Sequence, residues 1–428
     1  MMHYGFKRRR GILFWLFILA IASDPIIAIL YNIYLEKSWG LEVSFFQLTK
    51  GIFLLPLLII TLKNVSAFRT VRLLWPLLML FFYSFTMFLI LPIPDSWADL
   101  VWSLRVLYII MIFLAAYLLT INNIIQLDTL WKLAAFVVMA FLATQVIAIY
   151  AGYGGINAYG TDYGSLGFVS YAKTVPWAIC MSIPCFFMSR HWRSKDVLMI
   201  LISLVAVLLT LRRTVLLAFL LGFIIIGMIR FFRARMFSLY QIATLAVLSI
   251  IVVALSYVFS ETELGYAFIQ RINDLDPSQG TASGRYIFQK VALNYLLERG
   301  YIATLFGEGA GYPIIVLGER LQWFIQAHSD WLNIAIAYGV VGITFFIFLF
   351  VGILRMIISA KNKSSEILDM LIILIVIMFV CSIASGGLLE SSFALPYAAL
   401  GMAAAYLRNN FQTEIQDFVR IENNASAN

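Results

Sequence analysis

Long, unbroken apolar runs recur along almost the whole of this 428-residue chain. Each run is close to the ~20 residues that a helix needs to cross the ~30 Å hydrocarbon layer of a bilayer, whereas a membrane barrel would show stretches of ~10 residues with alternating polarity. Hydrophobic residues make up 62% of the sequence and charged residues only 12%, which excludes an ordinary soluble domain. The sequence therefore predicts an all-α, polytopic membrane protein.

About twelve apolar runs satisfy the length rule for a span. They are expected near residues 11–31, 44–62, 73–91, 98–119, 130–150, 168–188, 197–211, 215–232, 239–259, 330–354, 367–384 and 393–407. The first run follows a basic cluster and imitates a secretory signal, but it resumes beyond Pro25, so we interpret it as a retained span. Residues 1–428 are predicted to form a single integral membrane domain.

The loop charges predict the orientation of these spans. The net charge of +8 comes from cations in short loops, and most of the 30 Lys and Arg cluster beside span ends on one side. The positive-inside rule makes that side cytoplasmic, together with both termini. The basic balance is thus a signal of topology, and we expect no nucleic-acid partner. The three cysteines lie inside apolar runs without the spacing of a disulfide framework or a metal site.

Several cations do not follow this rule. Lys50, Arg105 and Lys173 lie inside apolar runs near their predicted outer ends, and Arg212 and Arg213 lie in a very short loop on the same side. A charge within a span costs a few kcal/mol, unless its stem lets the charged group reach the interface. Snorkelling and function are both open for each one taken singly. Their shared depth favours a common anion site that faces outward.

The loop between the ninth and tenth predicted spans, residues 260–329, is the one long polar interval. An amphipathic helix is expected from Ser283 to Gly300, with Arg285 near its start, followed by a glycine-rich turn at residues 306–312 whose backbone could approach a ligand. His328 ends the loop at the outer tip of the next span. The alternative for this histidine is a hydrogen-bonded residue of the interface.

Two structural expectations concern the start of that next span. Ser329 or Asp330 is expected to cap its first helical turn, where an acidic group also suits the positive end of the helix dipole. Ala335 and Gly339 are spaced so that a neighbouring helix could pack closely. Metal chemistry is not expected, because Asp274 and Asp276 in the loop have no His or Cys partner.

Three pieces follow one another along the chain: Leu211-Arg212-Arg213-Thr214, Ser283-Gly284-Arg285 with Phe306-Gly307-Glu308-Gly309, and His328-Ser329 followed by Gly339-Val340-Val341-Gly342. In this order they resemble the bacterial O-antigen polymerase and ligase superfamily, membrane glycosyltransferases of the GT-C kind. The resemblance covers about a third of the chain, from Leu211 to Phe350.

The resemblance implies a reaction in the bacterial inner membrane, on the periplasmic face, without a metal or another cofactor. The donor would be a glycan linked to undecaprenyl pyrophosphate, and the transfer would invert the anomeric centre. Arg285 with Arg212 or Arg213 would bind the pyrophosphate, and Lys50, Arg105 and Lys173 would add to that site. His328 would orient or deprotonate the acceptor hydroxyl, and Glu390 is considered as a helper.

The acceptor separates two versions of this enzyme. A polymerase extends another lipid-linked repeat unit, in concert with a chain-length regulator protein, whereas a ligase transfers the glycan to the lipid A core. The Asp330-Trp331-Leu332 sequence after His328 favours the polymerase. A flippase for the same lipid is a third reading, but a transporter should show broken helices near mid-membrane, and here the polar residues gather at one face.

Overall fold

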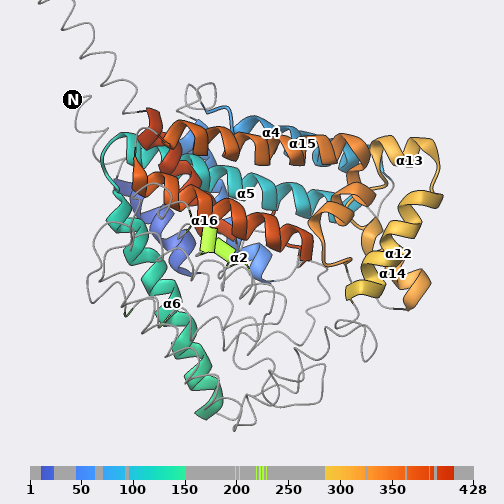
Figure 1. Ribbon diagram of the computed structural model, residues 1–428, viewed down its shortest axis with the longest axis horizontal. Helices are drawn as coiled ribbons and strands as arrows, with labels where there is room; N and C mark the ends of the chain where they lie inside the picture. Colours follow the sequence, from blue (N-terminus) through green and yellow to red (C-terminus); the bar gives the residue numbers. More distant parts are fainter. Residues whose placement is uncertain are drawn as a thin grey trace, which may run out of the picture.

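The computed structural model describes residues 11–23, 45–62, 71–91, 96–150, 285–322, 326–361, 364–384, 386–389 and 393–408, with isolated positions between 198 and 228. Every regular element in these ranges is a helix, which confirms the all-α class for them (Figure 1). The expected spans between 168 and 259 fall largely outside the described residues. The count of twelve spans therefore stays a prediction.

Three described helices are long and apolar enough to cross a membrane: Trp97–Ile121 within α5, Asp330–Ala360 as α15, and Glu366–Ala384 within α16. Helix α5 as a whole runs from Ser96 to Ile121, and α16 runs from Ser365 to Ala384. Gly11–Ser23 and α4, Leu74–Ile90, are shorter apolar helices. The remaining helices of the bundle are α2, Phe45–Leu62, α6, Leu127–Tyr150, and residues 394–408.

The bundle is built around α5. Its side chains from Ile109 to Ala116 are all buried, with α4 and α2 packed against it. Figure 1 shows α4, α5, α15 and α16 running side by side. A side chain at Gly401 would lie 2.3 Å from the carbonyl oxygen of Phe113, so this glycine lets helix 394–408 pack directly on the backbone of α5.

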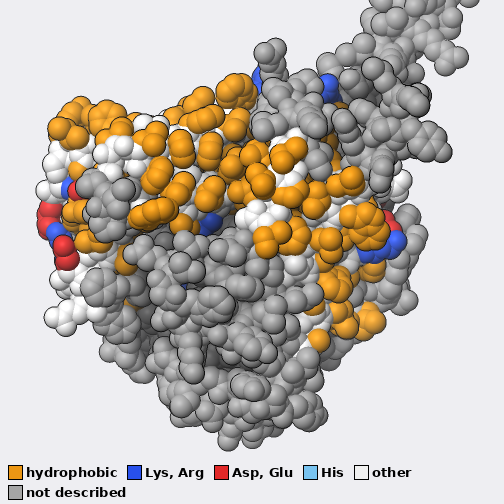
Figure 2. Space-filling view, turned by 180° about the vertical axis from the view of Figure 1, so that it is seen from behind, with side chains coloured by type: hydrophobic (Ala, Val, Ile, Leu, Met, Phe, Trp, Pro, Cys, Tyr) orange, Lys and Arg blue, Asp and Glu red, His pale blue; other side chains and the backbone are white. Residues whose placement is uncertain are grey.

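The outward faces of α4 and α15 carry large apolar side chains, as a bilayer requires. They include Phe82 and Ile90 of α4 and Phe348 and Ile358 of α15, each more than half exposed. In Figure 2, hydrophobic side chains cover most of the described surface, and most of the charged ones visible there lie toward its two ends. This distribution, together with the long apolar helices, is that of a multi-pass membrane protein.

Three shorter helices form a cluster at one end of the bundle (Figure 1): α12, Arg285–Glu298, α13, Tyr301–Phe306, and α14, Tyr312–Leu321. The predicted helix between Ser283 and Gly300 is confirmed by α12. Phe288 and Ala292 form its buried face, against α14 and the start of α15. Its other apolar residues do not all pack inward.

A kink in α15 joins this cluster to the membrane helices. Gly339 has φ 61° and ψ −157°, which interrupts the helix. The carbonyl of Ala337 therefore accepts hydrogen bonds from the backbone N–H groups of Glu308 and Gly309, at 3.1 and 2.9 Å. The expectation that Gly339 permits close packing holds, but its contact is the backbone of Leu305 in α13. The glycine-rich turn, whose backbone was expected to approach a ligand, lies against the backbone of α15, where a Cβ on Gly307 would be 2.3 Å from the carbonyl oxygen of Ala337.

Gly339→Ala is expected to destabilise the protein because its added Cβ would lie 2.4 Å from the carbonyl oxygen of Leu305, at a φ that disfavours any side chain. Such backbone strain costs about 1–3 kcal/mol before the clash is counted. Thermal unfolding of the full-length protein in detergent should show the loss. Gly300→Ala is the matched control, since Gly300 has open space around it and an ordinary φ of −65°. Equal melting temperatures for the two variants would contradict this prediction.

Candidate functional site

The first turn of α12 is attached to the last turn of α16. Arg285 donates a hydrogen bond from Nη1 to the carbonyl oxygen of Ala384, at 3.0 Å, and Gln289 donates from Nε2 to that of Ile383, at 3.3 Å. The last carbonyls of a helix have no partner within it and lie at its negative dipole end, so a guanidinium is favoured there. Arg285 therefore has a structural contact at the position where a phosphate-binding role is predicted.

His328 lies at the same place. Its ring centroid is 6.0 Å from that of Phe288, one helical turn after Arg285. Its φ of 52° lies in the left-handed region, which histidine tolerates better than most residues. A Cβ on Gly386, just beyond α16, would lie 3.6 Å from the backbone carbon of His328. The structure thus brings the two predicted catalytic residues, Arg285 and His328, to one end of α16.

The capping expectation for α15 is confirmed only in part, since Asp330 does place an acidic group in its first turn. Ser329 is the N-cap residue, but its side chain does not cap the helix; its hydroxyl donates to the carbonyl oxygen of Ser382 at 3.4 Å. The buried carboxylate of Asp330 accepts hydrogen bonds from the N–H groups of Gly387 and Leu388, at 2.7 and 2.9 Å. Both side chains instead form hydrogen bonds with backbone groups at the end of α16 and just after it, because α16 ends directly beside them.

Arg105 approaches the same region from α5. It lines a cavity of about 40 Å³ together with Asp330, Asn333 and Gly387. That volume holds about one water molecule, so it is a polar pocket rather than a space for a sugar. The cavity places the cation of α5 next to Pro313 of α14, in the cluster at this end of the bundle.

The other predicted cations are not located by the structure. Lys50 lies in α2, but its side chain is outside the described part. Lys173, Arg212, Arg213 and Glu390 all lie outside the described residues. The predicted pyrophosphate-binding set is therefore represented by Arg105 and Arg285.

Two further loop cations have structural partners. Arg320 forms an ion pair with Glu298, 2.7 Å from Nη2 to Oε2, and lies over the ring of Tyr295. Arg299 donates to the carbonyl oxygen of Ile336 at 3.3 Å, and burial lowers its pKa. Both residues hold α12 to its neighbours, which leaves them less suited to bind a substrate than Arg285.

A second contact holds the glycine-rich turn. The hydroxyl of Tyr295 donates a hydrogen bond to the carboxylate of Glu308. Burial raises the pKa of Tyr295, and this bond raises it further, so the phenol stays protonated and remains a donor. The pair connects α12 to the turn that rests on the kink of α15.

Asp99 is the residue that sequence reasoning missed. It lies in the first turn of α5 and is fully buried. Its carboxylate accepts hydrogen bonds from the N–H of Ala310, at 3.0 and 3.1 Å, and from the hydroxyl of Tyr338, at 2.9 Å. The nearest signal in the sequence is an acidic residue just inside an apolar run. Asp99 fixes the position of the turn relative to α5 and α15.

Asp99→Ala is expected to lower the free energy of unfolding by about 1–3 kcal/mol, because the buried N–H of Ala310 loses its acceptor. The melting temperature of the full-length protein measures this. Asp128→Ala is the control: Asp128 is exposed and pairs only with Lys132 on the surface of α6, so its loss should change stability by less than about 0.5 kcal/mol. If Asp99→Ala lowers the melting temperature no more than Asp128→Ala does, the Asp99 carboxylate does not hold the turn.

The described residues contain no group of three His, Cys, Asp or Glu side chains that could hold a metal ion. Metal-independent chemistry stays a prediction.

Comparison with known protein families matches part of the chain. Residues 198–347 fit the model of a family described as O-antigen ligase. The matched segment contains Arg285 and His328, all of α12, α13 and α14, and the kink at Gly339. No curated protein matches the chain.

Proposed function

Because residues 198–347 resemble the O-antigen ligase family, which supports the wider polymerase and ligase superfamily, we propose that this membrane protein is a glycosyltransferase. It transfers a glycan from an undecaprenyl-pyrophosphate-linked donor to a sugar hydroxyl on the periplasmic face of the inner membrane. The transfer follows a GT-C type, metal-independent mechanism that inverts the anomeric centre. The observation that carries this proposal is that Arg285 and His328, both inside the matched segment, lie at the same end of α16.

The chemistry follows from these two side chains. The acceptor hydroxyl attacks the anomeric carbon of the donor sugar, the bond to the pyrophosphate oxygen breaks, and negative charge grows on the leaving group. A guanidinium binds phosphate oxygens through two parallel N–H donors and stabilises that charge most in the transition state. Arg285 has this role, and Arg105, Lys50, Lys173 and Arg212 or Arg213 add positive potential.

His328 takes the proton from the attacking hydroxyl. An imidazole suits this step because its ordinary pKa is near neutrality. Its left-handed backbone conformation and its neighbours Phe288 and Gly386 hold the ring near the start of α12 and the end of α16. Glu390 lies three residues after Gly387 in the sequence, and the proposal keeps it as a helper of His328.

The exposed apolar residues of the outer cluster support a substrate that stays in the membrane. Leu297 of α12 and Tyr301 and Ile302 of α13 are each more than three-quarters exposed. Three exposed apolar side chains suit a position of α12 and α13 against the interface of a bilayer. The pyrophosphate of a lipid-linked donor would lie at the same interface. The site would then be at the depth of the donor headgroup.

The acceptor we propose is a second lipid-linked repeat unit, which makes the protein a polymerase working with a chain-length regulator. The ligase is the second candidate because the matched family is described as O-antigen ligase. Asp330 and Trp331, which favour the polymerase in the sequence, contact the end of α16: Trp331 Nε1 donates to the hydroxyl of Ser382 at 2.9 Å. Their structural role means that only an assay of acceptors can separate the two enzymes.

That assay uses the full-length protein in liposomes with a lipid-linked repeat unit, with and without lipid A core. Ladders of products without lipid A core support the polymerase, whereas glycan attached only to the core supports the ligase. Movement of the lipid-linked unit across the bilayer with no new glycosidic bond would support the flippase and overturn the proposed enzyme. The His328→Asn variant serves as the control without a general base.

A further inference from the structure

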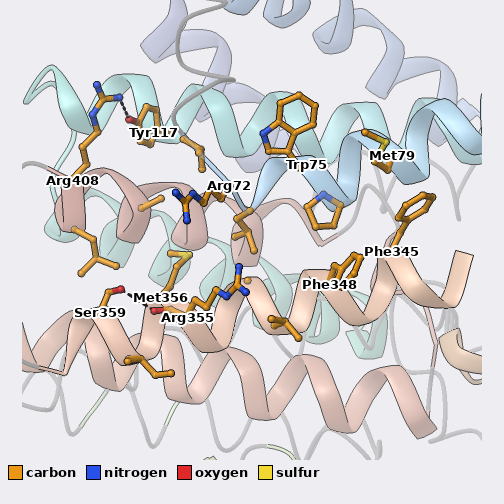
Figure 3. Close-up of a pocket in the computed structure, with 18 residues that line it drawn as sticks. Arg72, Trp75, Met79, Tyr117, Phe345, Phe348, Arg355, Met356, Ser359 and Arg408 are labelled. Atoms are coloured by element: carbon orange, nitrogen blue, oxygen red, sulfur yellow. Dashed lines mark hydrogen bonds between the residues drawn. The ribbon is translucent and has the colours of Figure 1, made fainter. Parts of the chain in front are cut away.

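A large groove lies in the half of the bundle away from the α12, α13 and α14 cluster. It runs between α4, α15 and helix 394–408 and has a volume of about 1320 Å³ (Figure 3). Three arginines from separate segments line it: Arg72 before α4, Arg355 in α15 and Arg408 at the end of helix 394–408. The proposed glycosyl-transfer site does not use any of them.

The charges of two of these arginines are not neutralised within the described residues. The ion pairs in that part of the chain join Lys132 to Asp128 and Arg320 to Glu298. Arg72 and Arg355 are exposed, and Figure 3 shows their side chains within the groove. Arg408 also lines the groove, but its Nη1 donates to the hydroxyl of Tyr117 at 2.6 Å, so its guanidinium is turned toward α5. Two exposed cations that line one groove, without an acidic partner among the described residues, favour a bound anion.

The rest of the groove is apolar. Met79 and Trp75 of α4 face Phe345 and Phe348 of α15 along its wall. From Arg355 to Phe345 the helix rises by about 15 Å at 1.5 Å per residue, which is half of the ~30 Å hydrocarbon layer. Trp75 lies one turn from Arg72, as aromatic residues do at the level of the headgroups. The groove therefore has the length and polarity of one leaflet.

We propose that this groove binds an anionic phospholipid of the leaflet that the loop charges predict to be cytoplasmic. The phosphate lies between Arg72 and Arg355, with Arg408 nearby, and an acyl chain follows the wall of Trp75, Met79, Phe345 and Phe348. Because Arg72 precedes α4 and Arg355 lies in α15, the lipid bridges two segments between which the described residues form no ion pair. The proposal does not depend on the reaction proposed above.

The experiment titrates the full-length protein in neutral detergent with phosphatidylglycerol and with phosphatidylcholine, and measures bound lipid by native mass spectrometry. Phosphatidylglycerol should bind more tightly. The double variant Arg72→Gln, Arg355→Gln should weaken its binding roughly 30-fold, at about 1 kcal/mol for each basic residue facing anionic lipid. Arg320→Gln, which removes an arginine at the other end of the bundle, should leave the lipid preference unchanged.

Four outcomes would overturn the proposal. They are equal affinity for the two phospholipids, unchanged affinity in the double variant, inorganic phosphate competing as well as phosphatidylglycerol does, and undecaprenyl phosphate binding more tightly than phosphatidylglycerol. If the double variant does not fold, the Lys variant at both positions keeps the charge, and it should still prefer phosphatidylglycerol. In that case, equal affinity of the wild-type protein for phosphatidylglycerol and phosphatidylcholine overturns the proposal.

Discussion

His328→Asn is expected to lower the rate of glycan transfer by on the order of 10²-fold or more, since asparagine cannot accept the proton of the acceptor hydroxyl. The structure makes asparagine the right substitution. Position 328 has φ 52°, and asparagine is among the residues that adopt this left-handed conformation most readily. The initial rate of product formation from a lipid-linked repeat unit is the measurement.

His328→Ala separates the imidazole from the backbone. Alanine lacks the base and also disfavours the left-handed region, so this variant should lose the same activity and some stability as well. If His328→Asn keeps its melting temperature but loses only a few-fold in rate, His328 is a positioning residue and another group takes the proton.

Arg285→Lys is expected to nearly abolish transfer while the protein still inserts and folds. A lysine retains a positive charge and a donor for the carbonyl oxygen of Ala384, so the contact between α12 and α16 can persist. It has no planar fork, and the paired hydrogen bonds to phosphate oxygens are lost. The rate should fall without a matching fall in melting temperature.

The control for this variant is Arg320→Lys. Arg320 pairs with Glu298 on the surface of the same cluster, where a point charge serves nearly as well as a fork. Its transfer rate should stay close to that of the wild type. Full activity in Arg285→Lys would remove Arg285 from the phosphate site and leave it as a cap for α16.

The sequence predicts the membrane helices closely because the bilayer imposes length and polarity on each one alone. The expected span 98–119 became α5, 96–121, and the span 367–384 became α16, 365–384. The largest difference is α15, which continues from the predicted end at Leu354 to Ala360. Arg355 and the residues after it form helix beyond the apolar run, so a rule based on hydropathy stops too early.

The contacts that shape the candidate site are harder to predict, because each depends on a partner far away in the sequence. The roles of Asp99, Asp330 and Gly339 depend on partners 34 to 239 residues away, from Leu305 beside Gly339 to Tyr338 beside Asp99. The capping rule considers only residues adjacent in sequence, so it predicted a helix cap for Asp330 and could not predict the contact with Gly387. The convergence of Arg285 and His328 was expected from the family resemblance and not from their spacing.

The bonding of the glycine-rich turn limits how this protein can be divided. Its N–H groups at Glu308, Gly309 and Ala310 use acceptors that belong to two membrane helices, Ala337 of α15 and Asp99 of α5. A water-soluble fragment of residues 260–329 would expose these donors and would lose the template that shapes them. Antibodies or inhibitors selected against such a fragment would meet a conformation that the intact protein does not present, so screening belongs on the whole chain in a lipid environment.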